Sequence, residues 1–342
     1  MHKLNRMLVF ILVFYISSCS VLDNKQDKPV NLVDEISDAF IKKDVHLFFF
    51  FRDNGQEGVF LAASYDGMHF TELNGGRPIF SAPATLGDGL TRDPSVILGT
   101  DNRFHMVWTT GWWQGDHFGI AHSEDLLSWS QAKRVPVHTM DPSALNVWAP
   151  EIFYDDLNDT YQVMFASTLR SLHDKETSEI APDGVGAEHR QYVVTTKDFN
   201  QWSDTDMFFD QEFSVIDAMI VRRAAHDYIM VIKDETLTPK AEKNLKLVYS
   251  KSALGPWTEA GPAITPKGMW IEGPSLNRIG KYWFLYFDDY AKGGYGALRS
   301  TDLVEWQDIS SDMSFPRGIR HGTILSVPRE RVKHLVKGLL EN

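Results

Sequence analysis

The stretch RDPSVIL (92–98) begins with two charged residues and a proline and continues into an apolar run. Four other stretches share this layout, in which one or two leading residues precede a small residue or proline and an apolar run. They are WAPEIFY (148–154), IDAMIV (216–221), IEGPSLN (271–277) and RHGTILS (320–326). A short apolar run bounded by turn residues is typical of a buried strand. We therefore expect five equivalent strands, each entered through polar residues.

A second repeated motif follows each of five strongly apolar segments. It runs from a small or hydroxylated residue, usually through an acidic one, to an aromatic residue and then to polar residues. The aromatic residues of this motif, 49 to 73 residues apart, are Phe70, Trp129, Trp202, Trp257 and Trp306. Self-similarity at about this interval indicates a repeat architecture such as a β-propeller, whose blades take ~40–50 residues each. We expect these five aromatic side chains to lie in the core.

The apolar segments themselves have the composition of strands. They are rich in β-branched and aromatic residues and are bounded by Gly, Asp and Asn. Their sequences are HLFFFF (46–51), FHMVWTTG (104–111), YQVMFAST (161–168), YIMVIKD (228–234) and YWFLYFDD (282–289). Each unit thus reads as an inner strand, a second apolar strand, a third strand and an outer strand. The sequence predicts an all-β fold, a five-bladed β-propeller of four-stranded antiparallel blades.

The order of the units predicts how the ring closes. The first unit (46–73) has no inner strand before its apolar segment, and the last inner-strand motif, HGTILSV (321–327), has no blade after it. We expect 321–327 to pair beside 46–51 and latch the two ends of the chain together. The tail 329–342 is expected to form a short helix.

The longest interval between repeats contains a polar insertion at 169–190. It follows an apolar segment, and we interpret it as a long loop. Two interpretations stay open at this point: a lid near the substrate, and a solvated excursion far from the site.

The first residues have the pattern of a bacterial lipoprotein signal. A basic start and a short apolar run lead to Ser17-Ser18-Cys19, which predicts a signal peptide over 1–19 and lipidation of Cys19. An ordinary signal peptide with an incidental cysteine is the alternative. Residues 20–40 are expected to be a polar tether, and 41–342 a single catalytic domain. This organisation predicts a lipid-anchored protein of the bacterial cell envelope, which meets the membrane through its lipid alone.

The composition limits the choice of partner. The chain has 342 residues and a formal net charge of −12, which argues against nucleic acid as a ligand but leaves neutral polysaccharides open. There is one cysteine, so no intramolecular disulfide can form. We expect a monomer.

Ionisable residues stand at the start of four of the five expected inner strands. Aligned on the apolar residues that follow, the shared position is occupied by Asp93, Ala149, Asp217, Glu272 and His321. Strands arranged round one axis would bring these side chains together at one mouth of the channel. Hydrolysis of a glycosidic bond needs two carboxyl groups, one to protonate the leaving oxygen and one to activate water or attack the sugar. The sequence therefore predicts a glycosidase site.

The five motifs RDPSV, NVWAPEI, IDAMIV, IEGPS and RHGTI, in this order, resemble glycoside hydrolase family 43 over roughly residues 45–328. The resemblance implies a five-bladed propeller acting on arabinofuranosides and β-xylosides with inversion at the anomeric carbon. By the same resemblance, Asp93 is the general base, Asp217 tunes the pKa of the acid, and Glu272 is the general acid. His321 corresponds to a histidine near a metal in the central channel, often calcium, held largely through water. No cofactor is required for the chemistry.

Aromatic and basic residues near these positions are candidates for sugar binding. An aromatic face matches the apolar C–H face of a sugar ring, and arginine binds its hydroxyl groups. The candidates are Trp148, Trp270, Trp112, Arg320 and Arg92. Trp148 and Trp270 fit blade packing equally well. Glu151, two residues beyond Ala149, should lie on the same strand face one step deeper, as a structural or metal-proximal carboxylate.

The predicted activity is hydrolysis of arabinofuranosyl or β-xylosyl linkages, with galactosyl linkages as a further candidate, in plant-type polysaccharides or their oligosaccharides. One alternative is a lipoprotein propeller that binds glycans without cleaving them, but such a module need not keep three convergent acids. A related enzyme of the invertase–levansucrase type is the other. Enzymes of that type carry an Asn-Asp-Pro and a Glu-Cys motif, whereas this chain has Arg-Asp-Pro and Glu-Gly-Pro.

Overall fold

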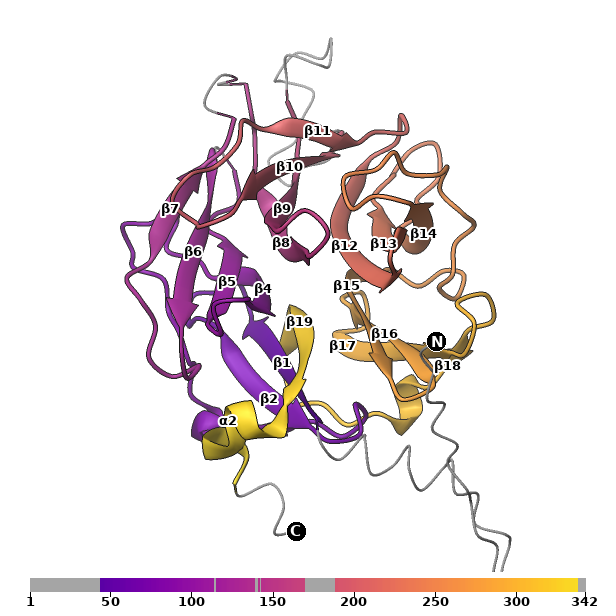
Figure 1. Ribbon diagram of the computed structural model, residues 1–342. Coiled ribbons are helices and arrows are strands. Elements are labelled where there is room, and N and C mark those ends of the chain that lie inside the picture. The colour runs from indigo at the N-terminus through magenta and orange to yellow at the C-terminus, as the bar shows by residue number, and fades with distance from the viewer. Residues whose placement is uncertain (1–43, 114, 139–140, 142, 170–187, 338–342) are drawn as a thin grey trace, which may run out of the picture.

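The computed structural model describes residues 44–113, 115–138, 141, 143–169 and 188–337, which form five antiparallel sheets round a central axis (Figure 1). Blade 1 comprises β19 (Ile319–Pro328), β1 (Asp44–Arg52), β2 (Phe60–Ser64) and β3 (Thr71–Glu72). Blade 2 comprises β4 (Arg92–Leu98), β5 (Phe104–Thr109), β6 (His117–Ser123) and β7 (Lys133–Pro136). Blade 3 comprises β8 (Trp148–Asp155), β9 (Thr160–Ser167), β10 (Arg190–Thr196) and β11 (Asp206–Phe209). Blade 4 comprises β12 (Val215–Ala224), β13 (Asp227–Asp234) and β14 (Asn244–Ser250). Blade 5 comprises β15 (Glu272–Ile279), β16 (Tyr282–Asp289), β17 (Gly294–Ser300) and β18 (Gln307–Asp308).

The predicted all-β, five-bladed propeller is confirmed, with one departure in blade 4. Among the described residues this sheet has three strands, and an irregular segment covers its outer edge. The segment donates backbone hydrogen bonds to β14 at Thr258, Gly261 and Ile264. Pro256 and Pro262 interrupt it. Proline has no N–H to donate, so a regular fourth strand does not form there.

The predicted latch is also confirmed. Strand β19 pairs antiparallel with β1 from Asp44 opposite Pro328 to Arg52 opposite Ile319. The first and last described strands therefore lie side by side in one sheet, and this pairing closes the ring. An open ring would leave two unpaired strand edges, which are prone to aggregate.

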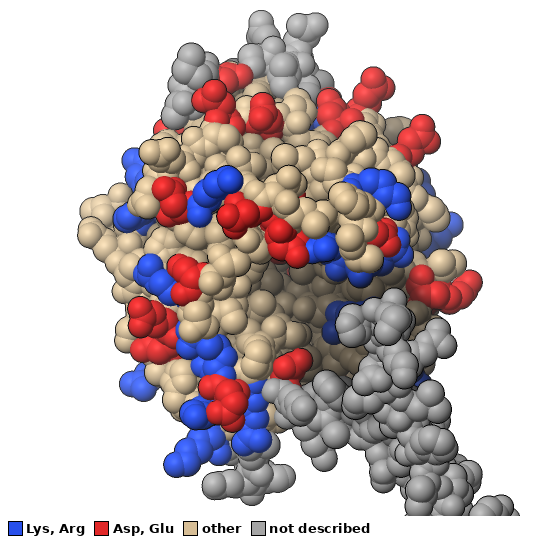
Figure 2. All heavy atoms as spheres, viewed as in Figure 1, with Lys and Arg blue, Asp and Glu red and all other residues tan. Residues whose placement is uncertain are grey.

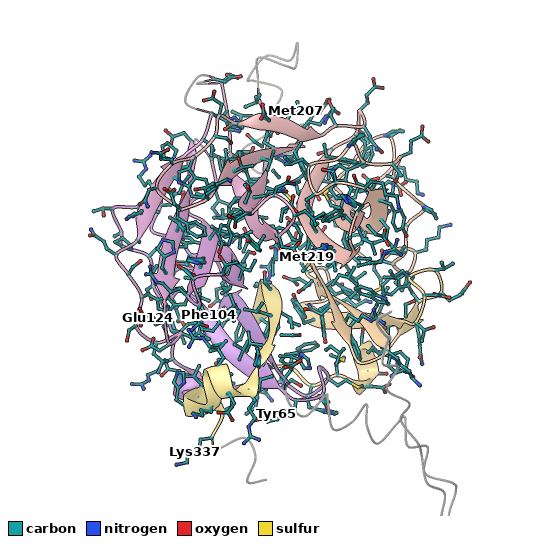
Figure 3. The ribbon with its side chains drawn as sticks, in the orientation of Figure 1. Tyr65, Phe104, Glu124, Met207, Met219 and Lys337 are labelled. Carbon is teal, nitrogen blue, oxygen red and sulfur yellow. The ribbon has the colours of Figure 1, made fainter. Side chains whose placement is uncertain are left out.

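The C-terminal helix α2 (Arg329–Val336) confirms the predicted short helix and covers the junction of blades 1 and 2. Val332 and Val336 are buried in the same cluster as Phe104. The Arg331 guanidinium donates to the carbonyl of Glu124 at 2.6 Å and lies 4.9 Å from the ring of Phe104 (both labelled in Figure 3). Two short 3₁₀ turns, Asn74–Gly76 and Ser310–Asp312, complete the helical content of the described residues.

Phe70 is buried in the core as predicted, whereas the four repeat tryptophans are partly buried and pack against the core. Each of the five aromatics lies between its own blade and the preceding one. Phe70 packs between blades 1 and 5, Trp129 between 2 and 1, Trp202 between 3 and 2, Trp257 between 4 and 3, and Trp306 between 5 and 4. The hydroxyl residue of the motif orders the turn before the aromatic. Ser300 Oγ, for example, accepts from the backbone N–H groups of Asp302 and Leu303, at 3.2 and 2.8 Å. The repeated motif thus encodes a turn and a contact between blades.

Several predictions concern residues outside the described part of the chain. The signal peptide 1–19 with Cys19 and the tether 20–40 lie outside it, as does most of the 169–190 insertion. Within the described part, no helix has the length and apolar character needed to cross a membrane.

Gly322 tests the closure of the ring. It lies in β19 opposite Phe50, and a Cβ atom there would come within 1.9 Å of the Phe49 carbonyl oxygen. We expect Gly322→Ala to push β19 away from β1 and lower the free energy of unfolding by about 1–3 kcal/mol, as overpacking does in close-packed interiors. The measurement is the unfolding midpoint in urea, with Gly294→Ala as the control because no atom lies within 4 Å of that position. Equal midpoints for the two variants would show that the β1–β19 contact does not limit stability.

Candidate active site

A β-bulge marks the start of each inner strand. The register shifts between Arg92 and Ser95 in β4, and at equivalent places in β8, β12, β15 and β19. The residues at the bulge have backbone φ of +48° at Asp93, +46° at Ala149, +53° at Asp217 and +60° at Gly273. A bulge adds one residue to its strand and re-aims the side chains beside it. Four of the five blades therefore share this bulge conformation, and His321 on β19 lies at a bulge without a positive φ.

The bulge corrects one alignment made from the sequence. Gly273, not Glu272, is equivalent to Asp93, Ala149, Asp217 and His321, so Glu272 lies one position earlier. The signal was present in the sequence, since Gly273-Pro274 matches Asp93-Pro94 and Ala149-Pro150. The inner strands thus form three levels, which we call the mouth ring, the bulge ring and the deep ring. The mouth ring is Arg92, Trp148, Ile216, Glu272 and Arg320; the bulge ring is Asp93, Ala149, Asp217, Gly273 and His321; the deep ring is Ser95, Glu151, Met219, Ser275 and Thr323.

The mouth ring and all of the bulge ring except Gly273 line a pocket of about 310 Å³. It brings together nearly all of the predicted site: Asp93, Asp217, Glu272, His321, Arg92, Arg320, Trp112 and Trp148. Four polar or aromatic lining residues were not predicted from the sequence: Asp53, Asn54, Glu235 and Tyr290. Trp270 is not part of the pocket lining; it is 41% exposed, and its ring lies 6.3 Å from that of Tyr290. The space-filling view shows acidic and basic side chains interspersed over the face it presents, so neither sign dominates it (Figure 2).

His321 stands between two of the predicted catalytic carboxylates. Its Nδ1 lies 3.4 Å from Asp93 Oδ1 and 3.7 Å from Asp217 Oδ2. Burial alone would lower the pKa of His321, but the charges of Asp217 and Asp93 outweigh it and raise the pKa. Burial raises the pKa of Asp217 to about 6, and the Glu272 charge adds to this rise against the opposing charges of His321 and Lys233. Asp217 also accepts a hydrogen bond from the Gly273 N–H at 2.9 Å, which fixes its orientation.

Glu272 is held by two cations. Lys233 Nζ donates to its Oε2 at 3.2 Å, and Arg320 Nη2 donates to its Oε1 at 3.1 Å. Burial would raise the pKa of Glu272, but Lys233, His321 and Arg320 together lower it to about 2. This differs from the prediction that the Asp217 charge would raise the pKa of the acid. Of the two carboxyls it is Asp217, not Glu272, whose pKa is raised.

The aromatic wall of the pocket is built round Asn54. Its Oδ1 accepts from Arg92 Nη1 at 2.5 Å and from Trp112 Nε1 at 2.9 Å. The Arg92 guanidinium lies 4.2 Å from the Trp112 ring and 4.8 Å from the Phe51 ring. Trp148 Nε1 donates to the Trp112 carbonyl at 2.6 Å. Trp112 therefore presents a fixed, 42% exposed ring at the mouth, a surface suited to the apolar face of a sugar.

Glu151 lies one level deeper than the predicted catalytic groups, as expected from its position on β8. It lines a small cavity of about 10 Å³ beneath the pocket, together with Asp93, Asp217 and His321. Burial raises the pKa of Glu151 to about 7, opposed by hydrogen bonds from Ser95 and Thr323 and by the His321 charge. A carboxyl in such surroundings is well suited to a structural role, because it can remain neutral near pH 7.

The surroundings of His321 do not match those of a directly bound metal ion. The described residues include no group of three or more His, Cys, Asp or Glu side chains placed to hold a metal ion. The two carboxylates facing Nδ1 favour the protonated imidazole. A protonated ring has no lone pair to offer a cation. These residues do not fit direct ligation, calcium held through water stays a prediction, and no step below uses a metal.

The raised pKa of Asp217 predicts a stability change with pH. Its pKa is about 6 in the folded protein against about 3.9 for an unperturbed aspartate, so the folded state binds this proton more tightly. The stabilisation that protonated Asp217 gives to the folded state is complete below pH 4 and is lost as pH rises through 6. Asparagine does not ionise, and we therefore expect Asp217→Asn to be more stable than the wild type at pH 8, by about 1–3 kcal/mol. The difference should shrink toward pH 4.

Asp302→Asn is the control for this measurement, made by urea unfolding at several pH values. Asp302 is exposed, and backbone N–H groups of Glu305 and Val304 lower its pKa. The ionised Asp302 carboxylate stabilises the folded state at neutral pH, and this contribution is lost in acid. The variant should therefore be less stable than the wild type at pH 8. A loss of stability at pH 8 in both variants would contradict the assignment of a raised pKa to Asp217.

Comparison with known proteins places the chain in a family. A family model described as "Probable glycosyl hydrolase domain", related to glycoside hydrolase family 43, matches residues 43–333. An α-L-arabinofuranosidase of Bifidobacterium longum subsp. longum is 26% identical over 263 residues, which cover 67% of this chain and 24% of that protein. This chain thus spans about a quarter of the length of that curated relative.

Two solved structures share the fold. A thermostable family-43 glycoside hydrolase aligns with a TM-score of 0.52 at 13% identity, over 70% of this chain and 80% of that one. An α-L-arabinofuranosidase from Lactobacillus brevis aligns with a TM-score of 0.50 at 17% identity, over 70% and 74%. The family model covers most of the chain, from residue 43 to residue 333, and the protein therefore belongs to this family of glycosyl hydrolase domains related to glycoside hydrolase family 43.

Proposed function

We propose that this protein is an inverting glycoside hydrolase that cleaves arabinofuranosyl or β-xylosyl linkages in plant-type polysaccharides or their oligosaccharides. Galactosyl linkages are a further candidate. The observation that carries the proposal is the convergence of Asp93, Asp217 and Glu272, from three different blades, on one pocket with an aromatic wall. The family membership and the arabinofuranosidase relative support the same class of reaction.

The roles proposed here for the three carboxyls are those that the resemblance to glycoside hydrolase family 43 implies. Asp93 lies beside His321, whose pKa is raised, and Asp93 serves as the base that takes a proton from water. Glu272 delivers a proton to the leaving oxygen and is re-protonated in each turnover. Asp217, held by the Gly273 N–H, orients this centre. Inversion requires the two reacting carboxyls to be ~6.5–9.5 Å apart, with room for water between them.

We also propose that the chain is a lipoprotein of a bacterial envelope, with Cys19 as the lipidated residue. The supporting pattern is the apolar run followed by Ser17-Ser18-Cys19. An enzyme tethered outside the cytoplasm would meet polysaccharide directly.

Substitution of Cys19 tests the anchor. We expect Cys19→Ala to abolish labelling by a radioactive fatty acid and to release the protein from the membrane fraction. Ser18→Ala is a suitable control, because alanine is also a small residue before the cysteine. Unchanged membrane retention of the Cys19 variant would contradict lipidation at this residue.

The dependence on leaving group separates the acid from the base. We expect Glu272→Ala to lose on the order of 10²–10⁴-fold in kcat/KM on substrates with poor leaving groups and much less on activated aryl glycosides. Asp93→Ala should lose activity on both, because water activation does not depend on the leaving group. NMR of the first product should show the inverted anomer for the wild type.

Exposed Glu305 gives the control variant Glu305→Ala, which should keep wild-type rates. An identical response of the Glu272 and Asp93 variants to leaving-group pKa would show that the two roles are misassigned. Retention of configuration would overturn the inverting mechanism.

A further inference from the structure

Lys233 is a buried lysine that no sequence motif singled out. It lies on β13, the second strand of blade 4, and its side chain is 1% exposed. Removing an ammonium group from water is costly unless carboxylates pair with it. Lys233 has two such partners, Glu235 Oε2 at 2.6 Å and Glu272 Oε2 at 3.2 Å. It also lies 5.0 Å from the ring centre of Tyr290, which lines the pocket.

Glu235 is the second anchor of this lysine. It follows β13 directly, lines the pocket, and pairs with Lys243 as well as with Lys233. The ammonium group of Lys233 therefore bridges one carboxylate that is already neutralised by another lysine and one that is predicted to be the general acid. Glu235 therefore gives Lys233 a second ion pair, one that does not depend on the charge of Glu272.

We propose that Lys233 is a positioning residue for Glu272: its ammonium group, held by Glu235, fixes the Glu272 side chain and opposes its protonation, and so sets the upper pH limit of the reaction. This proposal rests on the proposed glycosidase function. A proton that reaches Glu272 does so against the charge of Lys233. Other charged or titratable groups around Glu272 are Asp93, Asp217, Tyr290, Lys243, Asp288, Arg320 and His321, and these remain in the variants below.

Two substitutions should shift the pH dependence in opposite directions. Lys233→Met keeps the length and apolar stem of the side chain but removes the charge, so Glu272 should accept a proton more readily. The alkaline limb of the kcat/KM profile on a poor-leaving-group substrate should then move to higher pH. Glu235→Gln leaves Lys233 and Lys243 with one carboxylate fewer, so their charge should act more strongly on Glu272 and the limb should move to lower pH. A loss of packing alone would lower the rates of both variants, but it would not move the alkaline limb upward in one variant and downward in the other.

The control is Lys246→Met, which removes a lysine of the neighbouring strand β14 that pairs with Asp234 and not with the site. We expect the limb of this variant to stay at its wild-type pH. Unfolding midpoints of all three variants show whether each is folded at the assay temperature. If Lys233→Met does not fold, Glu235→Gln carries the test, because it leaves the lysine in place. A limb that stays fixed or moves upward in Glu235→Gln overturns the proposal, as does a limb that stays fixed in a folded Lys233→Met.

A direct titration makes the test independent of turnover. In protein labelled with ¹³C at the glutamate carboxyls, the Glu272 resonance is assigned by its absence from Glu272→Gln. We expect its pKa to rise by ~1–3 units in Lys233→Met, the size of effect that an adjacent opposite charge has. If no glycoside is cleaved but this shift is found, the proposed function fails while the effect of Lys233 on Glu272 stands. If glycosides are cleaved and the resonance does not shift, the proposed function stands and the role of Lys233 fails.

Discussion

The β-bulge at the start of each inner strand is the constraint on which the channel depends. Because it inserts one residue into the strand, the mouth-ring and bulge-ring residues of one blade can both line the pocket instead of alternating between opposite faces, and they do so in every blade but the fifth. The conformation is unfavourable for residues other than glycine, of the order of 1–2 kcal/mol each, yet Asp93, Ala149 and Asp217 all adopt it. Such strain persists only where the surrounding structure holds it in place.

The deep ring provides that support. Ser95 Oγ accepts from the Ile152 N–H of the next blade at 3.2 Å, and Ser275 Oγ accepts from the Ile324 N–H at 2.9 Å. Met219, labelled near the axis in Figure 3, takes the equivalent place with its sulfur 3.1 Å from the Leu276 nitrogen. Each of these links joins the inner strand of one blade to that of the next, just below the bulges. The polar groups above them are therefore held on inner strands that are linked to one another rather than on separate loops.

Much of this arrangement could be predicted from the sequence, because it is repeated. The blades, the latch and the inter-blade aromatics all come from patterns that recur five times. The features that could not be predicted each occur only once in the chain. Lys233 and Glu235 belong to a strand that reads as an ordinary apolar segment, YIMVIKD followed by Glu, and nothing in that pattern shows that the lysine reaches the site. The outer edge of blade 4 was missed for the same reason, since its prolines interrupt the repeat locally.

The charge balance of the pocket depends on the strand that closes the ring. Arg320 and His321 both come from β19, the last strand of the propeller, which pairs with the first. Arg320 bridges Glu272 and Asp288, at 3.1 and 2.7 Å, and His321 stands between Asp93 and Asp217. Without β19, three or more carboxyl groups would face one another with Lys233 as their main counter-charge, and neighbouring carboxylates of like charge oppose one another's ionisation. Closing the ring and completing the site are therefore the same event. A chain whose C-terminal strand is not paired with β1 lacks a stable first blade, and it also lacks the cations that allow the catalytic carboxylates to coexist.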